Sequence, residues 1–235
     1  AAEDALLAAD TLPADAAAVV DRIRRANASM LKANRQLLVA VEAALRENAQ
    51  LLDRLGGAEQ AARTDPLTGL MNRRGLTDTL AGAVAEAAEA GEPLAVALVD
   101  IDHFAQVNDQ WGPAIGDEVL RCIGQHLASR AQAAAPGAFT GRYGGEEFLM
   151  GLPGVPLAEA CAIVDRARAQ LVRQVVRRAS DGASLGRITY SAGVAVLHPG
   201  DAAETLLDRA DQALYAAKRA GRDRVLPELP PARSH

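Results

Sequence analysis

Acidic residues gather at two places in the sequence where the chain could present them to a ligand. Asp100 and Asp102 lie at the end of an apolar run, and Glu146 and Glu147 directly follow the pair Gly144-Gly145. A strand end is a rigid platform, and a glycine turn lets the backbone approach a ligand closely. If strand and turn are neighbours, the carboxylates converge, and a divalent cation with oxygen ligands would relieve their repulsion. The pattern favours Mg²⁺ and a phosphate-bearing substrate.

Two basic residues near the C-terminus extend this pattern. Lys218 and Arg222 are four residues apart at the end of a predicted helix, so both lie on one face and suit phosphate contacts. Simpler explanations exist for each piece, because acidic residues after a turn are usually just solvated and basic residues at a helix C-terminus compensate its dipole. The combination predicts a site only if the helix end meets the carboxylates.

Alternating strand and helix patterns would position these residues and indicate an α/β class. The Gly144-Gly145 pair separates two strand-like segments and is the strongest hairpin signal in the chain. Asp201 with Glu204 resembles a capping box for the last helix, and Gly221 supplies its C-terminal stop. The predicted strands are residues 93–102, 138–143, 146–152 and 187–197, and the predicted helices are residues 116–130, 157–177 and 202–220.

Residues 15–55 form a long helical pattern without Pro or Gly, which ends at Gly56-Gly57. Its seven-residue apolar repeat favours self-association as a coiled coil. A single helix packed on the main domain would also have an apolar stripe, about three positions wide in every seven. Asparagine at a favours the parallel dimer, because buried amides pair across the seam. The extra column e could hold residues 1–12 or a partner protein. The columns are a (Asn27, Asn34, Val41, Asn48, Leu55), d (Ile23, Met30, Leu37, Ala44, Leu51) and e (Leu31, Leu38, Leu45, Leu52).

Length and composition limit the other possibilities. The 235 residues allow a helical stalk over residues 1–62, one main domain over 63–226 and a disordered tail over 227–235. A net charge of −5, from 25 basic and 30 acidic residues, argues against nucleic acid or an anionic membrane as partner. No apolar stretch approaches the roughly 20 residues that a membrane span needs, so we expect a cytoplasmic protein.

Taken in order, these motifs resemble the GGDEF family of diguanylate cyclases over residues 64 to about 225. The resemblance implies a central, mainly antiparallel sheet wrapped by helices, related to the palm of nucleotidyl cyclases and polymerases and preceded here by the coiled-coil stalk. The matching blocks are residues 65–74 (DPLTGLMNRR), 100–109 (DIDHFAQVND), 116–120 (GDEVL), 142–148 (RYGGEEF) and 210–222 (ADQALYAAKRAGR).

The resemblance also implies a role for each candidate residue. Asp100, the Ile101 carbonyl and Glu146 would hold two Mg²⁺ or Mn²⁺ ions per site, with Glu147 as a further metal or hydroxyl contact. Asp100, Glu146 and Glu147 are thus the implied catalytic residues. For the substrate, Asn108 and Asp117 would read the guanine edge, the Phe104-Ala105 backbone, Lys218 and Arg222 would meet the phosphates, and Gly144 and Gly145 would complete the binding site.

The implied activity is the condensation of two GTP into cyclic di-GMP and two pyrophosphates. The 3′-hydroxyl of one GTP attacks the α-phosphorus of the other, and Glu146 or a metal-bound water takes its proton. Because each domain holds one GTP, two domains must face each other as half-sites of a homodimer. A parallel stalk would raise the effective concentration of the two domains to about the millimolar range.

Two positions and one four-residue window depart from the family pattern. Ala105 stands where the family usually carries lysine, which removes a phosphate contact, and Pro113 replaces a usual histidine in a loop. Residues 135–138 (APGA) occupy the window of the inhibitory RxxD product site, so we expect no product inhibition through that site.

Two other readings stay open. A degenerate GGDEF module would bind GTP or cyclic di-GMP as a sensor or scaffold, and Ala105 is the only support for it. A regulatory protein docked on the stalk would control the domain, because residues 1–62 are too few for a sensory domain.

Overall fold

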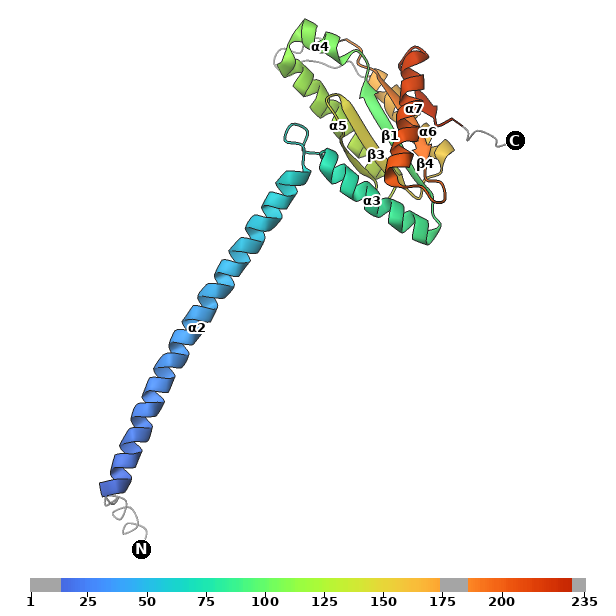
Figure 1. The fold of residues 1–235 in the computed structure, drawn as a ribbon. Helices are drawn as coiled ribbons and strands as arrows, with labels where there is room; N and C mark the ends of the chain where they lie inside the picture. Colours follow the sequence, from blue (N-terminus) through green and yellow to red (C-terminus); the bar gives the residue numbers. More distant parts are fainter. Residues whose placement is uncertain (1–13, 174–185, 230–235) are drawn as a thin grey trace. The chain divides into compact units, whose positions relative to one another are not determined.

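The computed structural model of the protein describes residues 14–173 and 186–229 (Figure 1). The chain divides into two compact units, Ala1–Ala58 and Glu59–His235. Within the described ranges, no helix is both long enough and apolar enough to cross a membrane.

Helix α2 extends from Ala14 to Arg63. The predicted end at Gly56-Gly57 is wrong, because the helix continues through both glycines. Glycine disfavours a helix interior by about 1 kcal/mol relative to alanine, which is too little to end a long helix. Up to Leu45, the last of them whose side chain is described, the large apolar residues of α2 are 37% to 67% exposed and leave an apolar face uncovered: Val19, Val20, Ile23, Met30, Leu31, Leu37, Leu38, Val39, Val41 and Leu45.

The second unit is built on a five-stranded sheet with the strand order β2-β3-β1-β4-β5. Every residue of the central strand β1 is buried, as expected for a strand with both faces covered. All neighbouring strands are antiparallel except β4 and β5, so the predicted mainly antiparallel sheet is confirmed. The strands are β1 (Leu94–Ile101), β2 (Phe139–Arg142), β3 (Glu147–Pro153), β4 (Tyr190–Val196) and β5 (Val225–Pro227).

Helices cover both faces of this sheet (Figure 1). Side chains alternate along β1, so Ala97 and Val99 join the core under α5 and α6, whereas Val96 and Leu98 join the core under α3 and α7. The strand end at Ile101 is thereby fixed from both sides. The helices of this unit are α3 (Arg73–Ala90), α4 (Phe104–Trp111), α5 (Pro113–Ala134), α6 (Leu157–Arg173) and α7 (Ala203–Arg219).

The predicted elements of this unit agree with the observed ones to within a few residues, with three additions. The sequence pattern does not predict α3, the short helix α4 or the short strand β5, and α5 begins at Pro113 rather than Gly116. The last four residues of the predicted helix 157–177 lie outside the described residues.

The start of α7 differs from the predicted capping box of Asp201 and Glu204. Ala202 is the N-cap residue and makes no side-chain cap bond. Asp201 instead accepts hydrogen bonds from the backbone amide of His198 (2.8 Å) and from Arg209 Nη2 (2.6 Å). The bond from the Arg209 guanidinium holds the pKa of Asp201 below its ordinary value. The carboxylate therefore serves an ion pair rather than the helix end.

The same arginine ties down the C-terminal segment. Arg209 is ion-paired with Glu228, which is only 7% exposed, and donates to the carbonyl of Val196 (2.7 Å). The prediction of a disordered tail from Pro227 is therefore wrong for its first residues, because Pro227 belongs to β5 and Glu228 is buried and paired.

Replacing this buried carboxylate tests the anchor. Glu228→Gln should lower the free energy of unfolding by about 1.5–3 kcal/mol, the usual contribution of hydrogen bonds to charged groups. Urea denaturation measures the change. The exposed Asp208→Asn on α7 is the control and should shift the value by less than about 0.5 kcal/mol; equal losses in the two variants would contradict the assignment.

Candidate active site

Strands β1 and β3 bring the two predicted groups of carboxylates together. Asp100 lies directly opposite Glu147 in the antiparallel register, and the Ile101 amide donates to the Glu146 carbonyl (3.3 Å). Burial raises the pKa of both Asp100 and Glu147, and the charge of Asp100, with smaller contributions from Asp211 and Glu146, raises that of Glu147 further. Negative charge is thus concentrated in a partly buried position, which favours binding of a cation.

The end of α7 supplies positive charge to the same place. Lys218 Nζ lies 2.7 Å from Asp100 Oδ2, and Arg222 also acts to lower the pKa of Asp100, although burial outweighs both cations. Arg222 follows Gly221 in a turn and has a left-handed φ of 62°. The helix end therefore meets the carboxylates, as the sequence pattern requires, and dipole compensation alone does not account for Lys218.

A cavity of about 310 Å³ opens beside the signature turn, residues 144–145. Its volume lies within the range of small-molecule sites. The remaining candidates do not line this cavity and belong to the carboxylate cluster or to the signature turn. They are Gly144, Glu147, Asp100, Ile101, Lys218 and Arg222. The lining contains both candidate guanine readers and the Phe104-Ala105 segment: Phe104, Ala105, Asn108, Pro113, Asp117, Leu120, Arg142, Gly145 and Glu146.

The signature turn needs its glycines for different reasons. The amide of Gly144 donates to the Glu147 carbonyl (3.2 Å), and a Cβ on Gly144 would lie 2.5 Å from Glu147 Oε2. A Cβ on Gly145 would meet nothing within 4 Å. The first glycine therefore makes room for the catalytic candidate Glu147, and the second leaves the backbone open to a ligand.

Arg142 holds this turn in place, a role that the sequence motifs do not predict. Arg142 donates from Nε (3.0 Å) and Nη2 (2.8 Å) to the Gly145 carbonyl, and its Nη1 lies 3.4 Å from Asp65 Oδ2. Asp65 is held by Thr68, whose amide (2.9 Å) and hydroxyl (2.7 Å) donate to it. Both residues lie in motif blocks, but only the fold shows that blocks 77 residues apart form one clamp.

Asn108 on α4 depends on a glycine in the neighbouring helix. A Cβ added to Gly116 would lie 1.9 Å from Asn108 Oδ1 and 3.2 Å from the Phe104 ring. Real Cβ atoms do not approach so closely, so a larger residue would displace the amide that lines the cavity.

If GTP is the substrate, as the resemblance of the sequence implies, Gly116→Ala should raise its KM by about tenfold or more, since one misplaced hydrogen-bonding group costs about that much in recognition. Steady-state kinetics over a range of GTP concentrations measures the change. Gly82→Ala is the matched control, because a Cβ at this exposed helical glycine meets nothing within 4 Å and should leave KM unchanged. Equal KM values in the two variants would remove Asn108 from the substrate site.

Asp102 does not join the carboxylate cluster, contrary to the expected convergence. It is 6% exposed and accepts bonds from the hydroxyls of Thr189 and Ser191 (2.7 Å each) and from the amide of Asp223 (3.0 Å). Strand β1 ends at Ile101, so Asp102 escapes the alternation that would place it beside Asp100. Its carboxylate ties the strand end to β4 and to the turn that carries Arg222.

The donor set suits a hard divalent cation. Among the described residues, no three His, Cys, Asp or Glu side chains are arranged as a ready-made metal cage. Asp100 and Glu147 supply oxygen atoms on neighbouring strands, and the pKa of each is raised mainly by burial and further by a neighbouring carboxylate. Sites for Mg²⁺ commonly use only one or two carboxylates together with substrate phosphates, so these residues fit such an ion.

Comparison with known proteins assigns the family. The family model described as "Diguanylate cyclase, GGDEF domain" matches residues 62–224. The chain belongs to the GGDEF family. Diguanylate cyclase DgcP of Pseudomonas aeruginosa is 42% identical over 166 residues, which are 71% of this chain and 24% of the relative. Diguanylate cyclase VdcA of Vibrio cholerae is 36% identical over 187 residues, 80% of this chain and 53% of the relative. The chain thus spans about a quarter to a half of these relatives.

Solved structures of GGDEF proteins share the fold. The coiled coil and GGDEF domain of DgcB from Caulobacter crescentus, in complex with c-di-GMP, matches with a TM-score of 0.74 and 38% identity, over 81% of this chain and 98% of that chain. The diguanylate cyclase SiaD in complex with its activator SiaC, from Pseudomonas aeruginosa, matches with a TM-score of 0.65 and 31% identity, over 96% of this chain and 86% of that chain. The predicted GGDEF fold with a preceding helical segment is confirmed.

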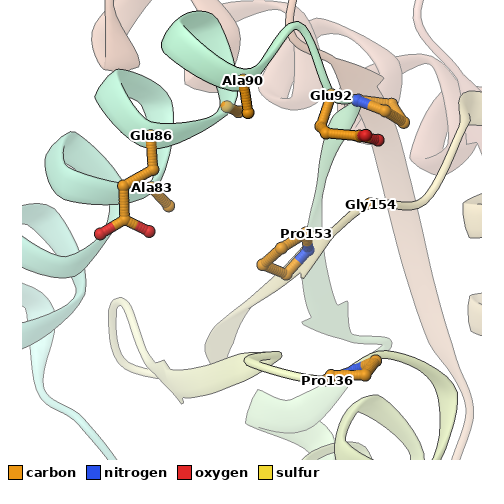
Figure 2. A pocket seen from close by; sticks show the side chains of 9 residues that line it. Ala83, Glu86, Ala90, Glu92, Pro136, Pro153 and Gly154 are labelled. Carbon is orange, nitrogen blue, oxygen red and sulfur yellow. The ribbon is translucent and has the colours of Figure 1, made fainter.

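The RxxD window of this GGDEF domain adjoins a second cavity, whose lining differs from that of the candidate substrate cavity. Residues 135–138 connect α5 to β2, and Pro136 lines a cavity of about 370 Å³ between α3 and the end of β3 (Figure 2). Alanine and proline form most of its wall, and its charged lining residues are Glu86 and Glu92. This wall is unsuited to a dianionic product, since an anion would face carboxylates there.

Proposed function

We propose that this GGDEF protein is a metal-dependent diguanylate cyclase that condenses two GTP into cyclic di-GMP and two pyrophosphates. The observation that carries the proposal is the pairing of Asp100 with Glu147 across β1 and β3, next to a cavity that contains Asn108 and Asp117. Nucleotidyl transfer needs charged groups at the phosphates and selective groups at the base, and these residues supply both.

The chain's own residues divide the work of the reaction. Asn108 and Asp117 hydrogen-bond the guanine edge, because a base without matching donors and acceptors would leave these groups unpaired. Lys218 and Arg222 hold the phosphates. Glu146 takes the proton of the 3′-hydroxyl as this oxygen attacks the α-phosphorus and the bond to pyrophosphate breaks in line.

Asp100, the Ile101 carbonyl, Glu146 and Glu147 would hold two Mg²⁺ or Mn²⁺ ions. The fit is supported by the all-oxygen donor set and by the pKa values of Asp100 and Glu147, which burial raises. Bound ions would neutralise charge on the pyrophosphate and acidify the attacking hydroxyl.

The proposed active form is a homodimer in which two domains face each other with one GTP each. Its support is the uncovered apolar face of α2, where the d residues Ile23, Met30 and Leu37 are 54%, 63% and 62% exposed. A parallel coiled coil would bury this face and keep the domains together.

A regulatory protein on the stalk completes the proposal. SiaD, which is similar to the chain over 96% of its length, was crystallised with its activator SiaC. The leucine column e of α2 remains available for such a partner, since a two-stranded seam uses mainly columns a and d.

Cyclic di-GMP is not expected to inhibit the enzyme through residues 135–138. This window contributes neither arginine nor aspartate, and Glu86 and Glu92 line the adjoining cavity. Feedback through the family's usual contacts would need the arginine and the aspartate that this window lacks.

A binding module without turnover is the second candidate, and Ala105 in the cavity lining is the observation that favours it. Incubation with GTP and Mg²⁺, followed by chromatography of the nucleotides, separates the candidates. Formation of cyclic di-GMP supports the cyclase, whereas GTP that remains intact while bound supports the module.

A further inference from the structure

Helix α2 exposes more apolar surface than a two-stranded seam uses. Beyond columns a and d, the e residues Leu31, Leu38 and Leu45 are 60%, 64% and 64% exposed. They recur every seven residues and therefore form a continuous ridge beside the seam. Solvent-exposed leucines in an unbroken row usually mark a contact surface.

Column g of the partner helix would form the floor of a groove beside this ridge. In a parallel dimer, position e of one helix lies beside position g of the other, where salt bridges usually form. Here the g positions include Ala26 and Ala33, so the side chains on this flank are apolar and small. Each flank of the proposed dimer would thus present a groove with a leucine wall and an alanine floor.

Arg35 in column b borders the leucine ridge, and further basic residues lie one column farther out, in column f. Arg25 and Arg46 are ion-paired with acidic residues one turn earlier, at 3.4 Å and 3.5 Å. Lys32 and Arg35 have no acidic residue three or four positions away, so their charges are not offset within the helix. A second dimer of this chain would bring like charges against this rim, whereas an acidic rim would complement it.

We propose that the groove formed by the e and g columns binds an amphipathic helix of a regulatory partner whose apolar face is flanked by Asp and Glu. This inference rests on the proposed dimer and specifies the chemistry of its partner. A helix in the groove contacts both stalk helices at once, so its binding favours the paired stalk over separated chains. The dimer has two equivalent grooves, one on each flank.

Fluorescence anisotropy with two labelled synthetic helices tests the proposal on the full chain. Both probes are four heptads long and share the same leucine and alanine face, but one is rimmed with glutamate and the other with lysine. The glutamate-rimmed probe should bind about tenfold or more tightly than the lysine-rimmed one, and salt should reduce this preference.

Two adjacent residues of similar exposure provide matched variants. Leu38 in column e is 64% exposed and Val39 in column f is 67% exposed, but they point about 100° apart on the helix. Leu38→Gln should weaken binding of the glutamate-rimmed probe by roughly tenfold, as expected for loss of a buried leucine contact. Val39→Gln should change it by less than about twofold.

Sedimentation velocity completes the test, because both variants should remain dimers. If neither probe binds, or if the two probes bind equally, the groove does not select an acidic helix and the proposal fails. If Leu38→Gln dissociates the dimer, the leucine ridge belongs to the seam itself and the groove does not exist. None of these readings uses GTP, so failure of the cyclase proposal would be seen separately.

Discussion

Asp100→Asn is expected to abolish formation of cyclic di-GMP, with turnover reduced by about a thousandfold or more, as for loss of a central metal-binding or charge-stabilising group. Asparagine keeps the shape of the side chain but removes the charge that faces Glu147 and contacts Lys218. The fold should tolerate the change, since it removes a charge from a buried position and leaves Lys218, its ion-pair partner, partly exposed to solvent. Rate measurements by nucleotide chromatography and urea denaturation give the two readouts.

The matched control is the other aspartate of the pair. Asp102→Asn disturbs a carboxylate that accepts three hydrogen bonds and should cost about 1–3 kcal/mol of stability. At a temperature where this variant is folded, its turnover should stay within about tenfold of the wild type. Comparable losses of turnover in the two variants would show that the strand end acts as one unit and that Asp100 has no separate chemical role.

Leu37→Lys is expected to give the second large effect, through the stalk rather than the site. Leu37 occupies column d, and a charge there should separate the proposed dimer. At micromolar enzyme, loss of a tether with a millimolar effective concentration lowers activity per chain by about a hundredfold to a thousandfold. Sedimentation velocity reports the oligomer, and the initial rate of the variant should rise with the square of its concentration.

Val39→Lys supplies the control, because the same charge is placed two residues later on the outer face of the helix. It should remain dimeric and keep its activity. A Leu37→Lys protein that is monomeric but fully active at micromolar concentration would contradict the requirement for two facing half-sites.

The sequence predicts those features whose signals are local. The apolar run of β1, the Gly144-Gly145 hairpin and the spacing of Lys218 and Arg222 each depend on residues close together in the chain. The strands, the hairpin and the helix end therefore agree with expectation, whereas the antiparallel direction of the sheet is implied by the family resemblance and the contact of Lys218 with Asp100 is shown by the fold.

The features that escape the sequence join distant segments or compete for one side chain. Asp65 contacts Arg142, which lies 77 residues further along the chain, and no local sequence pattern predicts this contact. Asp201 has the spacing of a cap, but Arg209 offers it a stronger, charge-assisted partner. Asp102 has the strand periodicity of Asp100, but the strand ends one residue before it, at Ile101. For Asp201 and Asp102, tertiary contacts override the local signal.

The most direct test of the central claim is to incubate the intact chain and Glu146→Ala with GTP and Mg²⁺ and to quantify cyclic di-GMP. Glu146 lines the cavity at the signature turn, whereas the exposed Glu89→Ala on α3 is a control with the same chemical change. The account predicts cyclic di-GMP from the wild type and from Glu89→Ala, and none from Glu146→Ala. Equal product from wild type and Glu146→Ala, or no product from the wild type at any enzyme concentration, would contradict it.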